Sequence, residues 1–318
     1  MDLKQLTYIV TIADSGSISQ AAEKLFMAQS SLSQALKIFE AELGTAIFMR
    51  TTRGVRPTAA GAAFIEQARQ ILNRYRLAQS EVWDIEGLQG GRVEFGISTY
   101  RGMYLLPPVL ARFKALYPGV HVQITELDSI ELEDRILKGL LDLALIAMPP
   151  VWLKDQVEFL LRDEIMLVTT SSHPIIEFAR PLPEGDGLWV DFYDTTGFEY
   201  ILGPPNTILG RAARQEFQKC GREPIGLNTN VSAPFAAAMA MEGLGLALTY
   251  RSCIVDRANV RYLRIGTQGV FLDLGLAYPS SEYRSKAASA LRELFYEIYL
   301  SAGDAAFEFA NDKIRKGK

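Results

Sequence analysis

The sequence predicts a chain of two unlike parts, an all-α N-terminal domain with a helix-turn-helix and a C-terminal α/β domain, joined by one long helix. Three observations support this fold class. Apolar residues recur at helical spacing through residues 3–43. A heptad pattern then continues to residue 85, with no Pro or Gly after residue 61. From residue 91, apolar strands alternate with helices, which is typical of a parallel-rich α/β sheet with right-handed crossovers.

Composition narrows the class of protein. The chain has 318 residues, of which 48% are hydrophobic, so it can bury more than one core. A net charge of −4 with 22% charged residues excludes a disordered polyelectrolyte. We find no signal peptide, and the most apolar stretch, residues 140–153, contains Asp142 and two prolines. We therefore expect a cytoplasmic protein that does not enter the membrane.

Catalytic and metal-binding signals are absent from the sequence. Cys220 and Cys253 form no metal-binding or disulfide pattern, and His121 and His173 have no metal-like spacing. An oxidant-sensing pair of cysteines is a minor alternative to two buried apolar cysteines. The sequence has no GxSxG, P-loop or GxGxxG motif. We expect no cofactor, no metal and no enzymatic activity.

The first 44 residues predict three short helices. The first carries its apolar face from Leu3 to Ala13 and ends at Gly16. Ser17 stands three residues before Gln20, the spacing of a capping box, so a second helix begins at Ile18. The third helix ends at Gly44. Two short helices with a tight turn, at about residues 18–37, form a helix-turn-helix.

The outer face of the third helix is polar. Small hydroxyls and amides can approach base edges and phosphates without bulk. The candidate DNA contacts of the helix-turn-helix are Ser17, Gln29, Ser30, Ser31, Ser33, Gln34 and Lys37. From spacing alone, a helical bundle with no partner is an equal alternative.

A basic segment follows the third helix. Residues 44–76 hold six arginines against one acid, Glu66, although the whole chain is acidic. Apolar residues 46–48 and 54–55 flank Arg50 and Arg53, a pattern that fits a small hairpin. Beside a helix-turn-helix, such a hairpin is a wing. We expect Arg53 at its tip, where the negative potential of a minor groove attracts arginine.

Residues 15–61 resemble the N-terminal domain of the LysR-type transcriptional regulators. The matching residues are Gly16-Ser17, Ala21-Ala22, Gln29 with Ser33, Phe39-Glu40 through Leu43-Gly44, Ile47-Phe48 with Arg50, and Thr58 with Gly61. Two positions depart from the family. Ala28 stands where Ser or Thr is usual, so that helix cap is missing or moves to Ser30. Phe39 replaces the commoner Leu.

A long helix follows Thr58, which is a good N-cap. Its apolar positions alternate by three and four, the pattern of a coiled-coil seam, although a helix lying on its own domain is the alternative. The resemblance implies pairing with the same helix of a second subunit. The candidate dimerisation residues are Phe64, Ala68, Ile71, Tyr75, Ala78 and Val82.

The rest of the chain predicts the α/β domain, which the resemblance describes as an effector-binding domain of two lobes similar to periplasmic binding proteins. Strands are expected at 92–98, 119–127, 141–148, 165–170, 198–203, 225–229, 245–250 and 271–278, and helices at 103–116, 130–139, 209–219, 234–242 and 282–300. The expected divisions are a DNA-binding domain at 1–58, a linker helix at 59–90, lobe I at 91–162 and 267–300, lobe II at 163–266, and a tail at 301–318.

In open α/β sheets, ligands bind at the carboxyl ends of strands, beside helix N-termini. The candidate effector-binding residues follow four strands: Ser98, Thr99, Tyr100 and Arg101; Ser129; Gly203, Pro204, Asn206 and Thr207; and Asn230, Val231 and Ser232. Arg101 suits a carboxylate. The alternative is that Ser129 and Ser232 are simple N-caps.

These observations favour a ligand-responsive regulator. The expected partners are double-stranded operator DNA, a small-molecule effector such as an organic acid, further copies of the chain in a homodimer and homotetramer, and RNA polymerase. One alternative is a solute-binding or enzymatic α/β protein with an accessory helical head. A third alternative is a nonspecific architectural DNA-binding protein. That function would not need more than two thirds of the chain.

Overall fold

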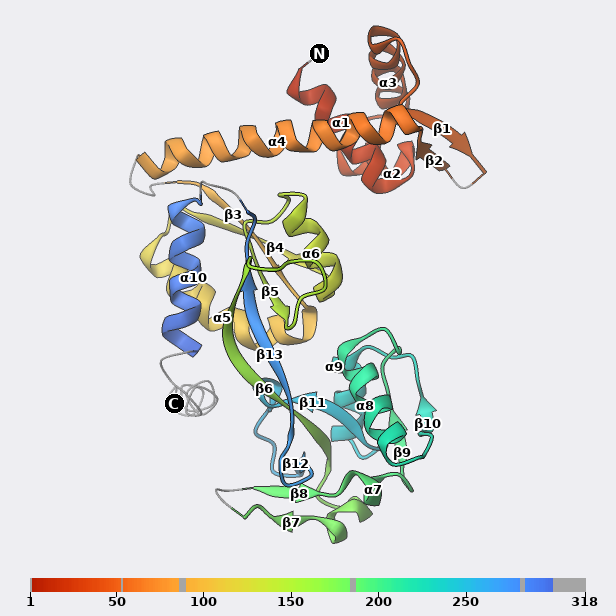
Figure 1. Ribbon diagram of the computed structural model, residues 1–318, viewed down its shortest axis with the longest axis vertical. Helices are drawn as coiled ribbons and strands as arrows, with labels where there is room; N and C mark the ends of the chain where they lie inside the picture. Colours follow the sequence, from red (N-terminus) through yellow and green to blue (C-terminus); the bar gives the residue numbers. More distant parts are fainter. Residues whose placement is uncertain (1, 53, 86–89, 184–186, 281–283, 300–318) are drawn as a thin grey trace.

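The computed structural model describes residues 2–52, 54–85, 90–183, 187–280 and 284–299. In Figure 1 a small helical head lies at one end of a long helix, α4, and the α/β domain lies below that helix. The α/β domain has an upper part around β3–β5 and a lower part around β8–β12, with β6 and β13 running between them. This is the predicted fold class.

The head contains α1 (Leu3–Ser15), α2 (Ile18–Lys24), α3 (Gln29–Leu43) and the hairpin of β1 (Phe48–Thr51) and β2 (Gly54–Pro57). A capping box between Asp2 and Gln5 begins α1, and Gly16, with φ of 60°, ends it. One apolar face of each helix is buried in a common core, which includes Ile12 and Leu32. The three predicted helices and the wing are all present.

The long helix α4 (Ala59–Ile85) begins where the sequence predicts. The Thr58 hydroxyl accepts a hydrogen bond from the Gly61 amide (2.9 Å) and donates one to the Ala46 carbonyl (2.8 Å). A β-carbon at Gly61 would lie 1.9 Å from the Ile47 carbonyl oxygen, so only glycine fits at this contact. At about 1.5 Å per residue the helix is roughly 40 Å long.

Lobe I is the upper part of the α/β domain. It contains β3 (Arg92–Ile97), α5 (Thr99–Leu116), β4 (His121–Glu126), α6 (Ser129–Leu137), β5 (Leu143–Ala147) and α10 (Lys286–Tyr299). Phe95 and Leu145 point toward α5 and α10, where Phe113 and Phe295 complete the core. Alternate residues such as Ile146 point to the opposite face, which α6 covers.

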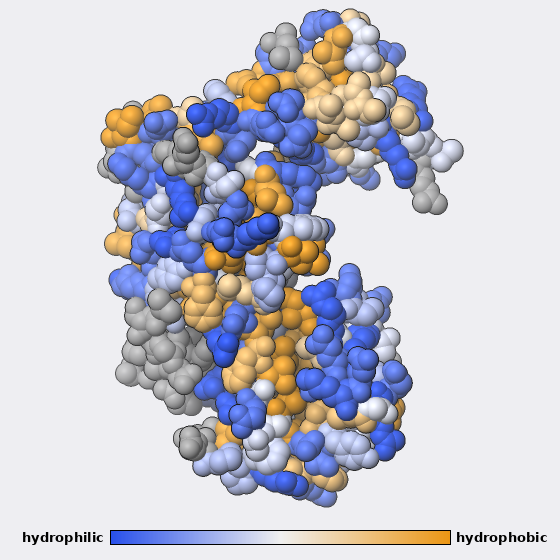
Figure 2. All heavy atoms as spheres, viewed as in Figure 1, coloured by the Kyte–Doolittle hydropathy of each residue, from blue (hydrophilic) through white to orange (hydrophobic). Residues whose placement is uncertain are grey.

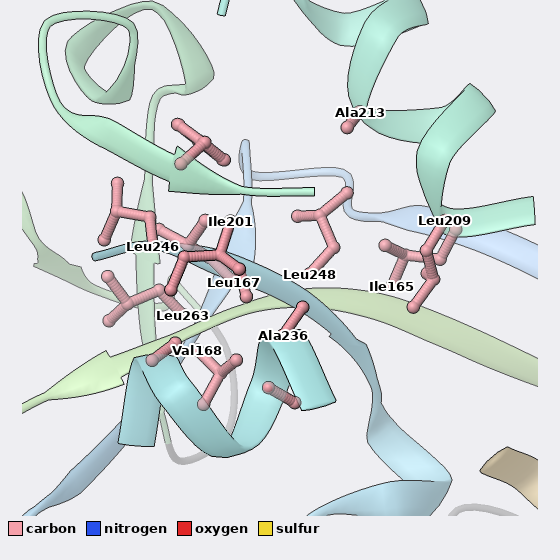
Figure 3. Close-up of a cluster of buried hydrophobic side chains, with 14 of the residues drawn as sticks. Ile165, Leu167, Val168, Ile201, Leu209, Ala213, Ala236, Leu246, Leu248 and Leu263 are labelled. Atoms are coloured by element: carbon pink, nitrogen blue, oxygen red, sulfur yellow. The ribbon is translucent and has the colours of Figure 1, made fainter. Parts of the chain in front are cut away.

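Lobe II has its own core, shown in Figure 3, in which Leu167, Ile201, Leu246 and Leu248 meet. Its elements are η1 (Pro174–Phe178), β7 (Arg180–Pro181), β8 (Leu188–Val190), α7 (Phe192–Thr195), β9 (Glu199–Ile201), α8 (Ile208–Lys219), β10 (Ile225–Asn228), α9 (Ala233–Met241), β11 (Ala247–Tyr250), η2 (Arg251–Cys253) and β12 (Val260–Ile265). The sequence does not predict η1, β7, β8, α7, η2 or β12.

One mixed sheet passes through both lobes, which corrects the expected parallel-rich sheet. Its order is β4-β3-β5-β13-β6-β12-β8-β7, with β11 also paired to β6. The strand β6 (Val157–Thr170) has 14 residues, and β13 (Val270–Ala277) pairs with it antiparallel. The sequence predicts only Ile165–Thr170 of β6, because the polar residues Arg162, Asp163 and Glu164 interrupt its apolar pattern.

Candidate DNA-binding face and effector cleft

The outer face of α3 is solvent-accessible. Gln29, Ser30, Ser31, Gln34 and Lys37 are exposed and Ser33 is half-buried, while Leu32, Leu36 and Phe39 anchor the other face in the head core. Ala28 occupies the N-cap position without a side-chain hydrogen bond, so the family's cap is missing here. Ser17 caps α2 by accepting from the Gln20 amide at 3.5 Å.

The wing is fixed to the turn between α1 and α2. The Val55 amide donates to the Gly16 carbonyl at 2.9 Å, and Gly54, with φ of 130°, allows the two backbones to meet. Arg50 is exposed on β1, where it pairs in register with Val55. Arg53, the residue expected at the wing tip, lies outside the described residues.

A side chain that the sequence does not single out joins the wing to α3. The Glu40 carboxylate, on α3, accepts hydrogen bonds from the backbone amides of Ile47 (2.7 Å) and Phe48 (3.1 Å). These amides begin the wing, so Glu40 sets its position relative to the exposed face of α3. The signal was available, because Phe39-Glu40 belongs to the motif on which the resemblance rests.

The heptad stripe of α4 divides into two parts. Ala68 is fully buried against Leu6 and Val10 of α1, and Phe64 is half-buried in the head, so these two residues pack within their own chain. Ala68 is therefore covered by α1 of its own chain, whereas the place of Phe64 in a seam with a partner stays a prediction. Further along, Ile71 (44%), Tyr75 (49%) and Val82 (55%) are exposed, and so is Ala78.

In lobe I, the candidate effector-binding residues lie where β3 and β4 end. Thr99 is exposed and Ser98 is half-buried at the start of α5, which begins four residues earlier than expected. The hydroxyl of Ser129 accepts a hydrogen bond from the Ala147 amide (3.1 Å), while Asp128 caps α6. Ser129 therefore connects the end of β4 to the end of β5 and is not the cap itself.

Tyr100 and Arg101 lie in the protein interior. The Tyr100 hydroxyl is 2.6 Å from the Thr249 hydroxyl, and the ring belongs to the core of lobe II although α5 belongs to lobe I. Arg101 is 1% exposed and donates to the Tyr250 hydroxyl (3.1 Å). The expectation that both face an effector is therefore corrected: helix α5 starts earlier, and its first turn packs against β11.

The lobe II candidates come together on two adjacent loops. The Val231 amide donates to the Leu202 carbonyl at 3.3 Å, which places residues 203–207 beside residues 230–232. Thr207 caps α8 through the Gly210 amide (3.2 Å), whereas Ser232 occupies the N-cap position of α9 without a side-chain bond. Asn206, Asn230 and Ser232 are exposed, Pro204 and Val231 are half-buried, and Gly203 is buried.

Apolar side chains gather over the middle of β6 and β13, between the two lobes (Figure 2). Phe159 on β6 (46%) and Phe271 on β13 (43%) are both exposed.

Within the described part of the chain, no group of three or more His, Cys, Asp or Glu side chains is placed to hold a metal. No described helix is long and apolar enough to span a membrane.

The two cysteines differ in environment. Cys253 is fully buried, and burial raises the pKa of its thiol far above the ordinary value. Cys220, at the C-terminus of α8, is half-buried, and burial raises the pKa of this thiol too. Neither environment favours a reactive thiolate.

Comparison with known families identifies the family that has this combination of a helical head and an α/β domain. The model of the bacterial regulatory helix-turn-helix protein of the lysR family matches residues 3–62, and the model of the LysR substrate binding domain matches residues 86–298. The chain belongs to the LysR family. It is a LysR-type transcriptional regulator with a helix-turn-helix head and an effector-binding domain, as the resemblance implies.

Relatives of the regulator match over nearly their whole length. The HTH-type transcriptional regulator YcgK of Bacillus subtilis is 40% identical over 307 residues, which cover 93% of this chain and 94% of that protein. The nitrogen assimilation regulatory protein nac of Klebsiella aerogenes is 34% identical and covers 94% and 95%. CbnR complexed with its target DNA has a TM-score of 0.63 at 21% identity, covering 93% and 99%.

Proposed function

We propose that α3 enters the major groove of operator DNA, with Gln29 and Ser33 toward base edges and the wing toward the neighbouring minor groove. The observation that carries this proposal is the exposed polar face of α3 fixed beside a basic hairpin through Glu40. That CbnR is found with target DNA supports the same role for this chain. Arg50 supplies positive charge toward the DNA phosphates, and Arg53 stays the expected minor-groove contact.

The test compares two variants on DNA taken from upstream of the protein's own gene. Gln29→Ala should relax preference at one base pair, at about 1–3 kcal/mol. Arg50→Ala should weaken binding to all sequences and reduce the salt slope by about one. Gln67→Ala, on the exposed side of α4, is the control. If the wild type binds this DNA in mobility shifts and neither variant changes that binding, the assignment is wrong.

We infer that the exposed stripe of Ile71, Tyr75, Ala78 and Val82 pairs with the same helix of a second subunit. Four apolar positions on one face of a helix form a surface that a partner helix would cover. Two such dimers would make the homotetramer. A paired helix also presents two heads to two half-sites, which operator recognition requires.

We propose that a small effector, such as an organic acid, binds between the lobes. Thr99 and the loops at 203–207 and 230–232 supply hydroxyls and amides there. A thermal-shift screen of small organic acids and aromatics would find it. Thr99→Val should then lower affinity about tenfold, whereas Thr196→Val, in the turn that ends α7, should not. Unchanged affinity of Thr99→Val contradicts the site.

We further infer that the protein acts in the cytoplasm, with DNA and RNA polymerase as partners, and that it catalyses no reaction. Its relatives are transcriptional regulators, which supports this reading. An α/β enzyme or solute-binding protein with a helical head would show turnover or ligand binding without any preference for operator DNA.

A further inference from the structure

The face of α4 opposite the exposed apolar stripe contacts lobe I of the same chain. Arg76 donates from Nη1 to Oδ1 of Asp142 (2.5 Å), and from Nη2 to the Gly139 carbonyl (3.0 Å) and to Asn73 Oδ1 (2.9 Å). The other oxygen of Asp142 accepts from the Glu94 amide (2.8 Å), at the start of β3. A single carboxylate thus joins α4 to the sheet of lobe I.

The second contact lies two turns further along α4. Asp84, which is 6% exposed, accepts through Oδ2 from the amide of Lys286 (2.9 Å), the first residue of α10. The Lys286 ammonium donates back to the Asp84 carbonyl (3.0 Å). A carboxylate at a helix N-terminus satisfies free amides and favours the helix dipole. Asp84 of the linker helix therefore accepts a hydrogen bond at the N-terminus of α10, more than 200 residues away in the sequence.

The same helix is attached to the head at its other end. Arg69 pairs with Asp14 of α1, and Ala68 packs against Leu6 and Val10. Figure 1 shows α4 extending from the head across the top of lobe I. Head, α4 and lobe I are thus joined in series, and lobe II is connected to lobe I through the shared sheet, in which β6 pairs with β13.

The contact between α4 and lobe I is not a continuous dry seam. A small pocket of about 30 Å³ lies along it, bounded by Leu77 on α4 and by Tyr278, Ser285 and Ala288 on lobe I. Two polar contacts beside a pocket can be broken at less cost than a packed apolar interface, because solvent can rehydrate the separated groups. Such a contact can hold α4 in one orientation on lobe I without the stability of a packed apolar interface.

We propose that Arg76 and Asp84 are positioning residues that fix the orientation of the DNA-binding head on lobe I. With both contacts made, α4 is a strut, so the separation of two heads in a dimer is set by how the effector domains associate. Lobe II is then the part that moves when the cleft between the lobes closes. This consequence for DNA rests on the proposed function, whereas the strut itself does not.

The test measures the orientation directly in the full-length protein. Spin labels go on the exposed positions Lys24 of the head and Gln123 of β4, each replaced by Cys in a Cys220→Ser background. Labelled chains are diluted with unlabelled ones, so that distances within one chain are read. Wild type and the matched control Arg74→Ala, an exposed arginine of α4, should give one narrow distance distribution. Arg76→Ala with Asp84→Ala should broaden it.

A second measurement separates positioning from folding. The double variant should bind a duplex with one half-site as wild type does, and should lose about tenfold affinity for the full site with its fixed spacing. Arg76→Lys with native Asp84 should recover most of the full-site affinity. An unchanged distance distribution in a folded double variant overturns the strut. Wild-type protein that binds no operator overturns the proposed function and leaves the distance measurement valid.

Discussion

At the scale of single residues, carboxylates that accept hydrogen bonds from backbone amides fix the positions of several elements. Glu40 holds two wing amides, Asp142 joins α4 to β3, and Glu133 accepts from the amides of Val151, Trp152 and Leu153. Each carboxylate satisfies backbone donors that a turn leaves free. The apolar periodicity of the sequence does not predict such roles, because the partners lie close together only after folding.

Removing Glu40 should loosen the wing without unfolding the helices. Glu40→Ala leaves the Ile47 and Phe48 amides without their acceptor, at a cost of about 1–3 kcal/mol in the stability of the head. Operator affinity should fall, since the wing no longer keeps its place beside α3. Urea unfolding and mobility shifts measure both effects, and Glu23→Ala, an exposed acid on α2, is the control. Wild-type values for Glu40→Ala would contradict this role.

The cysteines give a prediction about pH. Burial raises the pKa of both thiols, so the thiolate that reacts is scarcer at pH 8 than for an ordinary cysteine. Cys253 should stay unmodified by a thiol reagent until the protein unfolds, and Cys220 should react slowly, and faster as the pH rises. Mass spectrometry after timed labelling reads each site. A Cys220–Cys253 disulfide after peroxide treatment would instead support oxidant sensing.

At the scale of elements, the sequence predicts those whose signals are local. The end of α1 at Gly16, the cap at Thr58 and the long helix that follows it lie where the sequence predicts them. What failed depends on distant partners. Ala68 has the spacing of a seam residue, but α1 covers it, and the polar centre of β6 concealed a strand that crosses between lobes. Periodicity shows that a face is apolar, and does not show what covers it.

The exposed part of α4 should carry dimerisation. Ile71→Glu places two carboxylates in a dry seam, which is an expensive burial. Light scattering should show dissociation into smaller species, and affinity for a full operator should collapse. Gln70→Glu adds the same charge on a different side of the helix and should leave the assembly intact. A full-size oligomer after Ile71→Glu would exclude α4 from the interface.

At the scale of the whole molecule, the two lobes meet around a buried charged cluster. Arg101, in the first turn of α5, has its guanidinium 4.6 Å from the centre of the Tyr250 ring, and its Nε and Nη1 have no hydrogen-bond partner among the residues described. Asp163, in the middle of β6, accepts from the amide (3.1 Å) and hydroxyl (2.6 Å) of Ser252. The sequence predicts Arg101 as an effector-binding residue that suits a carboxylate, whereas the structure buries its side chain in the first turn of α5.

This cluster gives the effector domain a specific dependence on pH. Burial raises the pKa of Asp163, while the Ser252 hydrogen bonds and the Arg101 charge oppose the rise. Asp163 thus binds its proton more tightly when folded than when unfolded. The stability it contributes is complete below the ordinary aspartate pKa of about 4 and is lost as pH rises through the folded pKa. Arg101→Ala removes the nearby positive charge, which raises the pKa of Asp163 further.

Arg101→Ala should therefore destabilise the effector domain by about 3 kcal/mol near neutrality, because it leaves a buried carboxylate uncompensated. At pH 5 the loss should be smaller, since more of Asp163 is protonated there in the variant. Urea unfolding of both proteins at pH 5 and pH 8 measures the two differences, with Arg180→Ala, an exposed arginine, as control. The same loss of stability at both pH values would mean that Arg101 acts by packing on Tyr250. The protonation of Asp163 would then not depend on the charge of Arg101.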